Sequence, residues 1–137
     1  MDAQGGLLGL IAKRMEWLGQ RQNLIAENVA NASSTAESPG GEPYRRRLVS
    51  FGNVLDRVLG VEKVEVKSVF TDKSDFGRRF DPGHPAADAD GYVLTPNVNT
   101  VMEMSDMREA QRSYEANLKA IQAARAMLRE TLQILRL

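Results

Sequence analysis

The side chains best able to do chemistry are spread along this chain, and none of them completes a site motif. An Asp-Ala-Asp-Gly segment at 88–91 is typical of the start of a calcium-binding loop. The EF-hand pattern, however, needs a further oxygen ligand where Ala86 stands and a final glutamate where Asn97 stands. His84 is the single histidine and cysteine is absent, so a zinc site would lack its other ligands. We therefore expect no metal and no cofactor.

Catalytic arrangements are equally incomplete. The serines lack the Gly-x-Ser-x-Gly setting, and a Ser-His-Asp triad would have to use His84, which stands in a turn between prolines. Asp72 and Asp75 are close in sequence, but they belong to a polar stretch that is typical of an exposed loop. An enzyme would need a concave pocket with perturbed carboxylates, and no residue set here predicts one. We expect no catalytic residue.

The arginine run at 45–47 raises the question of a phosphate or nucleic-acid site. On a strand, Arg45 and Arg47 would face one way and Arg46 the other, so the three would not converge. A solvated edge, or an edge that forms salt bridges with another subunit, explains the run better. Lys plus Arg and Asp plus Glu are 18 each, giving a formal net charge of zero, whereas binding to nucleic acid normally needs a basic excess.

Membrane insertion and Sec-type export are not indicated. The longest apolar runs are far too short to cross a bilayer. A short apolar patch at 7–11 is followed directly by Lys13 and Arg14, and no basic region precedes it, unlike a secretory signal peptide. If the protein leaves the cytoplasm, we expect it to do so uncleaved.

Both ends of the chain have the pattern of a long amphipathic helix. The first is expected from Gly5 or Gly6 to about Asn31, before a loop rich in Ser, Pro and Gly. Its apolar stripe steps three and four residues in turn, as in a coiled coil. The stripe consists of Leu8, Ile11, Met15, Leu18, Ile25 and Val29, with Gln22 at the one polar position that completes the spacing. Asn28 and Asn31 close the helix, either as C-caps or through bonds to another helix end.

The second helix is expected to begin at Asn99 or Thr100, either of which could be the N-cap, with Glu103 in the first turn. It has neither Pro nor Gly up to the last residue, so its length would be about 57 Å. A helix this long must project from a small protein or bundle with others, and its alanines favour packing on more than one side. Its stripe comprises Met104, Met107, Tyr114, Leu118, Ile121, Leu128, Leu132 and Leu135, with Gln111 and Arg125 at the two polar positions that complete the spacing.

The middle of the chain has a β-and-turn pattern instead. Strands are expected within 44–51, 61–70 and 92–94, and 54–59 fits a strand or a helix. Residues 81–85 predict a turn. The fold class is therefore α+β: two terminal helices packed as a coiled-coil-like axial core, with a small, loosely built β-rich region. We divide the chain into 1–32, 33–96 and 97–137, with both helices in one core domain.

Several segments carry a family resemblance over nearly the whole chain. Asn-Val-Ala-Asn-Ala at 28–32, after an amphipathic helix, resembles the Asn-x-Ala-Asn signature of bacterial flagellar axial proteins, which build the rod and hook. Segments 96–104 and 112–117 are similar to the same group. Within the group, 41–45 and 84–93 resemble the proximal rod proteins, although His84 stands where that family usually has Asn, and Ala86 where it has Leu.

The resemblance implies a non-enzymatic subunit of the flagellar drive shaft, which assembles helically and transmits torque from motor to hook and filament. It implies a place in the periplasmic rod of the basal body and uncleaved export through the flagellar type III apparatus. The implied partners are copies of this chain and neighbouring rod proteins, notably FlgB and FlgF, with other rod or MS-ring proteins as further candidates. Both apolar stripes, with Asn28 and Asn31, would then form the assembly interface, and the free subunit's termini would be partly unfolded.

Three alternatives to this interpretation remain. The chain could be another rod subunit such as FlgB, although the block at 88–93 disfavours it. It could be a soluble coiled-coil adaptor or export chaperone, which would form a closed oligomer of low order. Least favoured is an enzyme that uses the β-rich middle.

Overall fold

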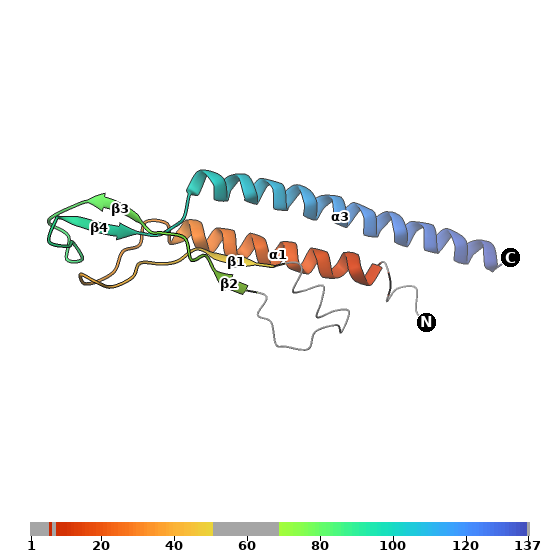
Figure 1. The fold of residues 1–137 in the computed structure, drawn as a ribbon. Helices are drawn as coiled ribbons and strands as arrows, with labels where there is room; N and C mark the ends of the chain where they lie inside the picture. Colours follow the sequence, from red (N-terminus) through yellow and green to blue (C-terminus); the bar gives the residue numbers. More distant parts are fainter. Residues whose placement is uncertain (1–5, 7, 51–68, 137) are drawn as a thin grey trace, which may run out of the picture.

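Two long helices lie side by side, and short strands gather toward one end of the molecule (Figure 1). The computed structural model describes residues 6, 8–50 and 69–136. In chain order, the elements are α1 (Gly9–Ala30), β1 (Arg47–Val49), β2 (Val69–Thr71), β3 (Gly77–Phe80), β4 (Tyr92–Thr95) and α3 (Thr100–Leu135). The expected α+β class is confirmed. The division at 32 and 96 stays a prediction.

Helix α1 ends where the sequence predicted. Its buried side chains are Leu18, Leu24, Ile25 and Asn28, which recur at helical spacing and make one face. Asn31 caps the C-terminus: its side-chain amide donates to the Glu27 carbonyl oxygen at 2.8 Å. The predicted start at Gly5 or Gly6 lies at the edge of the described residues, and the regular helix begins at Gly9.

Helix α3 begins at the cap that the sequence predicted. The Asn99 side chain accepts hydrogen bonds from the backbone N–H groups of Val101 and Met102, which would otherwise lack partners in the first turn. The helix then continues for 36 residues, or about 54 Å, against 22 residues and about 33 Å for α1. One helix is therefore about 21 Å longer than its neighbour.

The two helices are antiparallel. Asn28 near the end of α1 lies 3.5 Å from Glu103 near the start of α3, while Arg21 lies 3.8 Å from Glu109. Continuing this register places Gly9 opposite about residue 121 of α3. Residues 122–135 therefore extend past α1, as the blue end of α3 does in Figure 1.

The face of α3 toward α1 is offset from the predicted stripe. Met107, Tyr114 and Ile121 are half-buried and belong to both. The buried or half-buried positions of this face also include Glu103, Ala110, Asn117 and Ala124, which are spaced seven residues apart. Met104 and Leu118, which the stripe predicted at these levels, are exposed. The small alanines let the helices approach closely, so the larger side chains next to them point away from α1.

The strands form two separate antiparallel pairs. β1 pairs with β2 in the register Arg47↔Thr71, and β3 pairs with β4 in the register Arg78↔Leu94. β1 lies inside the predicted 44–51 strand, and β4 confirms the strand at 92–94. Of the predicted 61–70 strand only the last two residues are described, as part of β2; the 54–59 prediction lies outside the described residues.

Strand β3 was not predicted, because its sequence, Gly-Arg-Arg-Phe, has no apolar alternation and all four residues are exposed. It forms a hairpin with β4 around the predicted turn. At the end of the loop that connects the two strands, Gly91 has a φ of 85° and leaves room for the Phe80 ring, which would lie 3.0 Å from a Cβ at this position. Among the described residues, no helix is long and apolar enough to cross a membrane.

Candidate functional site

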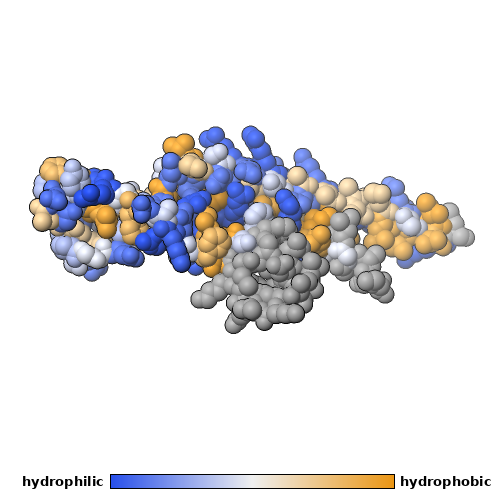
Figure 2. Space-filling model, viewed as in Figure 1, coloured by the Kyte–Doolittle hydropathy of each residue, from blue (hydrophilic) through white to orange (hydrophobic). Residues whose placement is uncertain are grey.

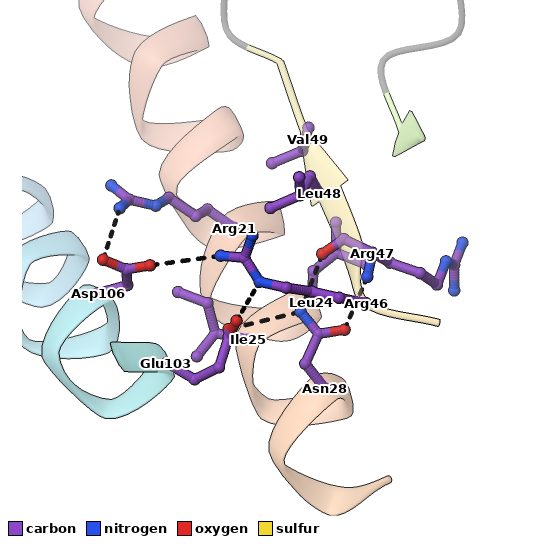
Figure 3. A pocket seen from close by; sticks show the side chains of 10 residues that line it. All are labelled: Arg21, Leu24, Ile25, Asn28, Arg46, Arg47, Leu48, Val49, Glu103 and Asp106. Atoms are coloured by element: carbon purple, nitrogen blue, oxygen red, sulfur yellow. Dashed lines mark hydrogen bonds and ion pairs between the residues drawn. The ribbon is translucent and has the colours of Figure 1, made fainter. Parts of the chain in front are cut away.

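The junction of α1, β1 and α3 contains a polar cluster around a cavity of about 100 Å³ (Figure 3). We call this cluster the helix junction. Leucine, isoleucine and valine side chains form part of its wall, and charged or amide side chains form the rest. The lining residues are Arg21, Leu24, Ile25, Asn28, Arg46, Arg47, Leu48, Val49, Glu103 and Asp106.

Asn28 joins α1 to β1 through its side chain. Its amide nitrogen donates to the Arg47 carbonyl oxygen at 2.9 Å, and its carbonyl oxygen accepts from the Arg47 backbone N–H at 2.9 Å. The same oxygen accepts from the Tyr44 hydroxyl at 2.6 Å. Asn28 is only 1% exposed, so these bonds satisfy groups that have little access to water.

Burial is the main reason why the pKa of Tyr44 is raised, with the nearby charge of Glu27 adding to it. The hydroxyl therefore stays protonated and keeps donating to Asn28.

The prediction that Asn28 acts as a helix cap is wrong: it lies inside α1 and bonds across to a strand. Asn31 alone has the capping role.

Glu103 joins α3 to the same strand. It is 1% exposed and pairs with the guanidinium of Arg46 through the arginine Nε. A buried carboxylate is costly unless it is paired and hydrogen-bonded, and Arg46 supplies both the charge and the donor. Asn28 lies 3.5 Å away on the other side of the carboxylate. The start of α3 is thus tied to both β1 and α1.

Arg46 also reaches two further carboxylates, at 3.5 Å from Asp72 and 3.6 Å from Asp106. Burial by itself lowers the pKa of Arg46, but the hydrogen bonds and charges of Glu103 and Asp72 outweigh it, so the pKa is raised. The guanidinium stays charged at any pH at which the protein folds. The prediction that this arginine belongs to a solvated or intersubunit edge is wrong, because its partners lie within the chain.

Asn97 makes a second amide bridge beside the junction. Its side-chain oxygen accepts from the Arg46 backbone N–H at 2.8 Å, and its nitrogen donates to the Asp72 carbonyl oxygen at 2.9 Å. The residue precedes α3 by three positions, so the bridge fixes where the chain enters the helix. Arg21 completes the set, 3.8 Å from both Asp106 and Glu109.

This arrangement holds elements together and leaves little chemistry free. Within the described part of the chain, every buried side-chain nitrogen and oxygen has a hydrogen-bond partner. The same residues contain no group of three or more His, Cys, Asp or Glu side chains placed to hold a metal ion. The carboxylates of the junction are bound by arginines or amides. The junction therefore acts as a joint between the helices and the strands.

The predicted interface residues fall into three groups. Leu18, Ile25 and Asn28 are buried within the chain. A second group is half-buried: Leu8, Ile11, Met15, Val29, Asn31, Met107, Tyr114 and Ile121. The third group is exposed: Met104, Leu118, Leu128, Leu132 and Leu135. A role of these residues in assembly stays a prediction.

Comparison with known proteins identifies the family. Residues 89–134 match the family described as flagellar basal body rod FlgEFG protein C-terminal. The chain is 46% identical to the flagellar basal-body rod protein FlgC of Agrobacterium fabrum, over 99% of this chain and 98% of the relative. It is 37% identical to FlgC of Bacillus subtilis, over 83% and 86%, and 35% identical to FlgC of Salmonella typhimurium, over 97% and 93%.

These matches place the chain among the bacterial flagellar basal-body rod proteins. Within that class it belongs to the FlgC family, the structural, non-enzymatic subunits of the proximal rod. The recognition from residues 28–32 and the later segments is confirmed, and the adaptor, enzyme and FlgB alternatives are set aside.

Proposed function

We propose that the exposed apolar face of α3 over residues 118–135, most of which extend past α1, is the surface through which this subunit is built into the rod. Neighbouring subunits cover its apolar side chains, and the stacked helices then form a shaft that grows helically and transmits torque. The exposed members of the predicted interface lie between subunits, whereas Leu18 and Ile25 stabilise the subunit itself.

The observation that carries the proposal is the exposed apolar surface of this segment. Ile134 is 70% exposed and Leu135 76%, and the described residues offer no helix opposite them. The other large exposed apolar side chains of the segment are Leu118, Met127, Leu128 and Leu132. Figure 2 shows the same hydrophobic colouring over the projecting end. Apolar surface gathered in this way marks an interaction site.

The energy available from this surface is large. Burying a Leu, Ile or Met side chain is worth about 1.5–3 kcal/mol, and ordering the side chains and the helix offsets part of it. Each subunit carries several such side chains. Before the ordering cost is subtracted, their burial therefore contributes a large favourable free energy to assembly. Because many packed side chains must be displaced together, a bundle of helices also resists shear.

The helix junction has a part in this function. Torque that reaches α3 must pass to α1 without sliding one helix along the other. The Arg46–Glu103 pair and the Asn28 bonds fix the axial position of both helices relative to β1, so the pair moves as one body. The junction thus supplies stiffness where the helices leave the strands.

Neighbours and export complete the proposal. The subunit contacts copies of itself and other rod proteins, with FlgB and FlgF as the nearest candidates and other rod or MS-ring proteins beyond them. It reaches the periplasmic rod uncleaved, through the flagellar type III apparatus. Membership of the FlgC family is what supports this part of the proposal.

A pair of substitutions one residue apart tests the interface. Leu132→Asp places a charge on the exposed apolar face, and Gln133→Asp adds the same charge on the polar face that holds Arg129 and Arg136. In a bacterium that lacks its own copy, we expect Leu132→Asp to abolish swimming and rod completion. Gln133→Asp should preserve both.

The purified proteins give the control for folding. Leu132 is exposed, so its substitution should leave the free energy of unfolding within about 0.5 kcal/mol of the original. Normal swimming with Leu132→Asp, or equal loss with both variants, would contradict the proposed interface.

A further inference from the structure

Three arginines follow one edge of α3 where the helix extends past α1. Arg125, Arg129 and Arg136 succeed one another at intervals of four and seven residues, and all three are exposed. At about 100° of rotation per residue, they lie within about 40° of one another around the helix axis and cover about 16 Å of its length. We call these three residues the arginine stripe.

The arginine stripe has no counter-charge on its own side of the helix. Residues 118–136 carry four cationic side chains, the stripe and Lys119, against the single carboxylate of Glu130, which gives this segment a net charge of +3. Glu130 lies about 100° or more from each arginine around the helix. Within the part of the chain that the structure describes, no stripe arginine forms an ion pair, whereas Arg46 lies close to three carboxylates.

The polarity of the helix accounts for only one of the three charges. A cation near the C-terminus of a helix is stabilised by the partial negative charge of the last carbonyl groups, and this effect fades within the last turn. Arg136 is at that end, whereas Arg125 and Arg129 stand ten and six residues before Leu135, the last helical residue. These two charges therefore need another explanation.

The arginine stripe borders the exposed apolar face of α3. Leu128 follows Arg125 by three residues, and Leu132 follows Arg129 by three, so each leucine lies about 60° from its arginine around the helix. Both leucines are exposed. A helix that packs on these leucines would bring its own neighbouring side chains up to the guanidinium groups. In coiled coils, charged residues beside the apolar seam choose the partner in this way.

The stripe defines the chemistry of such a partner. Residues three, four or seven apart share one face of an α-helix, so Asp or Glu at these intervals would form a row that matches the arginine stripe. The planar guanidinium group suits a carboxylate, because the two can form a pair of parallel hydrogen bonds. The partner helix also needs an apolar face beside its carboxylates to cover the leucines.

A second copy of this chain does not offer that row on its described helices. The two carboxylates of α1 already pair with cations of their own chain, at 3.3 and 2.8 Å. The first three carboxylates of α3 also have arginine partners within the chain. The two helical carboxylates without an ion pair, Glu115 and Glu130, are 15 residues apart, which is too far to form a row. The match therefore favours a different chain.

We propose that the arginine stripe pairs with a row of carboxylates on an amphipathic helix of a different rod subunit. This inference rests on the proposed assembly function and names the chemistry of the partner that covers the projecting helix. The apolar side chains supply most of the favourable free energy, and the charge pairs select the partner and its register, because carboxylates displaced by one or two residues turn away from the stripe.

An anionic lipid surface would also attract the arginine stripe. Helices that lie in a membrane interface commonly carry Trp or Phe among their apolar residues, and residues 118–136 contain no aromatic side chain. The apolar face that continues from the contact with α1 is instead typical of helix packing. A helix is therefore the favoured occupant, and lipid binding is included as an outcome of the test.

Charge reversal tests the need for the stripe. Arg125→Glu combined with Arg129→Glu reverses two of its three charges and leaves the apolar face unchanged. The matched control, Arg108→Glu with Arg112→Glu, changes the net charge equally at the same spacing, at exposed residues without an ion pair in the described chain. In a bacterium that lacks its own copy, isolated basal bodies should contain the stripe variant at roughly a tenth of the original level or less, and the control at nearly the original level.

The single substitution Gln133→Asp sets a lower limit for this effect. It keeps all three arginines and adds one carboxylate beside them, so the stripe can still bind its partner and the variant should still assemble. Urea unfolding of the purified proteins gives the control for folding, and both reversal variants should unfold at close to the original midpoint.

Zero-length cross-linking identifies the partner. Arg129→Lys keeps the positive charge and adds an amine, which a carbodiimide joins to a carboxylate in direct contact with it. In isolated basal bodies, mass spectrometry should find this lysine linked to Asp or Glu of another rod protein. Arg112→Lys is the control and should give roughly tenfold less of such a product, because no acidic row is expected at that position.

The outcomes distinguish this inference from the proposed assembly function. Links from position 129 to acidic residues of a different rod protein support the inference. Links mainly to another copy of this chain, or equal yields from both lysines, overturn it. If the stripe variant assembles normally, or is lost no more than its control, while Leu132→Asp is excluded, the inference fails and the assembly function stands.

Two further results are decisive. If the purified chain floats with phosphatidylglycerol vesicles, the stripe variant does not, and position 129 gives no protein link, lipid is the occupant and the inference is overturned. If the stripe variant and Leu132→Asp both enter basal bodies at the original level, both proposals are wrong.

Discussion

The side-chain amide of Asn28 forms hydrogen bonds with both backbone polar groups of Arg47, its N–H and its C=O, each at 2.9 Å. A helix side chain thus occupies the position that a neighbouring strand would take in a sheet. The other edge of β1 is paired with β2. A strand of only three residues is therefore held on both edges, which gives the helices a fixed anchor.

Removing the Asn28 amide should destabilise the subunit strongly. Asn28→Ala leaves both Arg47 backbone groups and the Tyr44 hydroxyl without their partner, and we expect the free energy of unfolding to fall by about 2–3 kcal/mol. Urea unfolding of the purified chain measures this. Asn31→Ala, which loses one cap bond to Glu27, is the control and should cost about 1 kcal/mol. Equal losses would contradict the bridging role of Asn28.

The Arg46–Glu103 pair should behave as a buried charge pair. Glu103→Leu leaves Arg46 with a desolvated charge and only its more exposed partners, so we expect a loss of about 3 kcal/mol. Adding Arg46→Met to the same chain removes the unpaired charge and should recover most of that loss. A double-mutant cycle by urea unfolding tests the coupling. If the loss of unfolding free energy in the double variant equals the sum of the losses in the two single variants, the two side chains act independently.

Acid should weaken the loop between β2 and β3 through Asp72. Its pKa is lowered below 3.8, first by the Ser74 backbone N–H at 2.8 Å and further by the Ser74 hydroxyl and Arg46. A lowered folded-state pKa gives stability that is complete above the unfolded-state value and is lost as pH falls through the folded-state value.

The free energy of unfolding should therefore decrease less below about pH 4 in Asp72→Asn than in the original chain. Urea unfolding over a pH series measures this. Asp75→Asn, a nearby exposed residue, is the control. An unchanged pH profile for Asp72→Asn would rule out this contribution.

Hydrogen exchange should divide α3 into two parts in the free subunit. Residues 103–117 pack on α1, so their amides should exchange slowly. Residues 122–135 extend past α1, and an isolated helix of this length is marginal in water, so their amides should exchange at least a hundredfold faster. Mass-spectrometric exchange on a monodisperse sample tests this. Strong protection across 122–135 in such a sample would contradict the idea that this segment becomes ordered only on assembly.

The helices could be predicted because their signals are local. Asn99 at the cap and the Ser, Pro and Gly loop after Asn31 mark boundaries that the structure confirms. The contact face of α3 was harder to predict. The stripe was traced through the largest apolar side chains, Met104 and Leu118, but the face toward α1 uses Glu103 and Ala110. A search for apolar periodicity does not detect this face, because Ala110 is small and Glu103 is charged.

The helix junction itself could not be predicted from the sequence. Arg46 is bound by Glu103, which is 57 residues away, and Asn97 reaches back 51 residues. Partners so far apart are chosen by the fold. Strand alternation places Arg46 on the opposite face from Arg45 and Arg47, but it does not say which face meets the helices. A weak signal did exist: Glu103 lies one heptad before Ala110, on the face that continues through Asn117 and Ala124.

A cryo-EM map of isolated basal bodies, with this chain traced, tests the central claim most directly. The measurement is the distance from the side chains of Leu128 and Leu132 to atoms of neighbouring subunits. We expect both to lie within about 4.5 Å of apolar atoms from other subunits, in a core of helices. If these side chains face solvent in the assembled rod, or if α3 folds back so that they pack on their own chain, the account is contradicted.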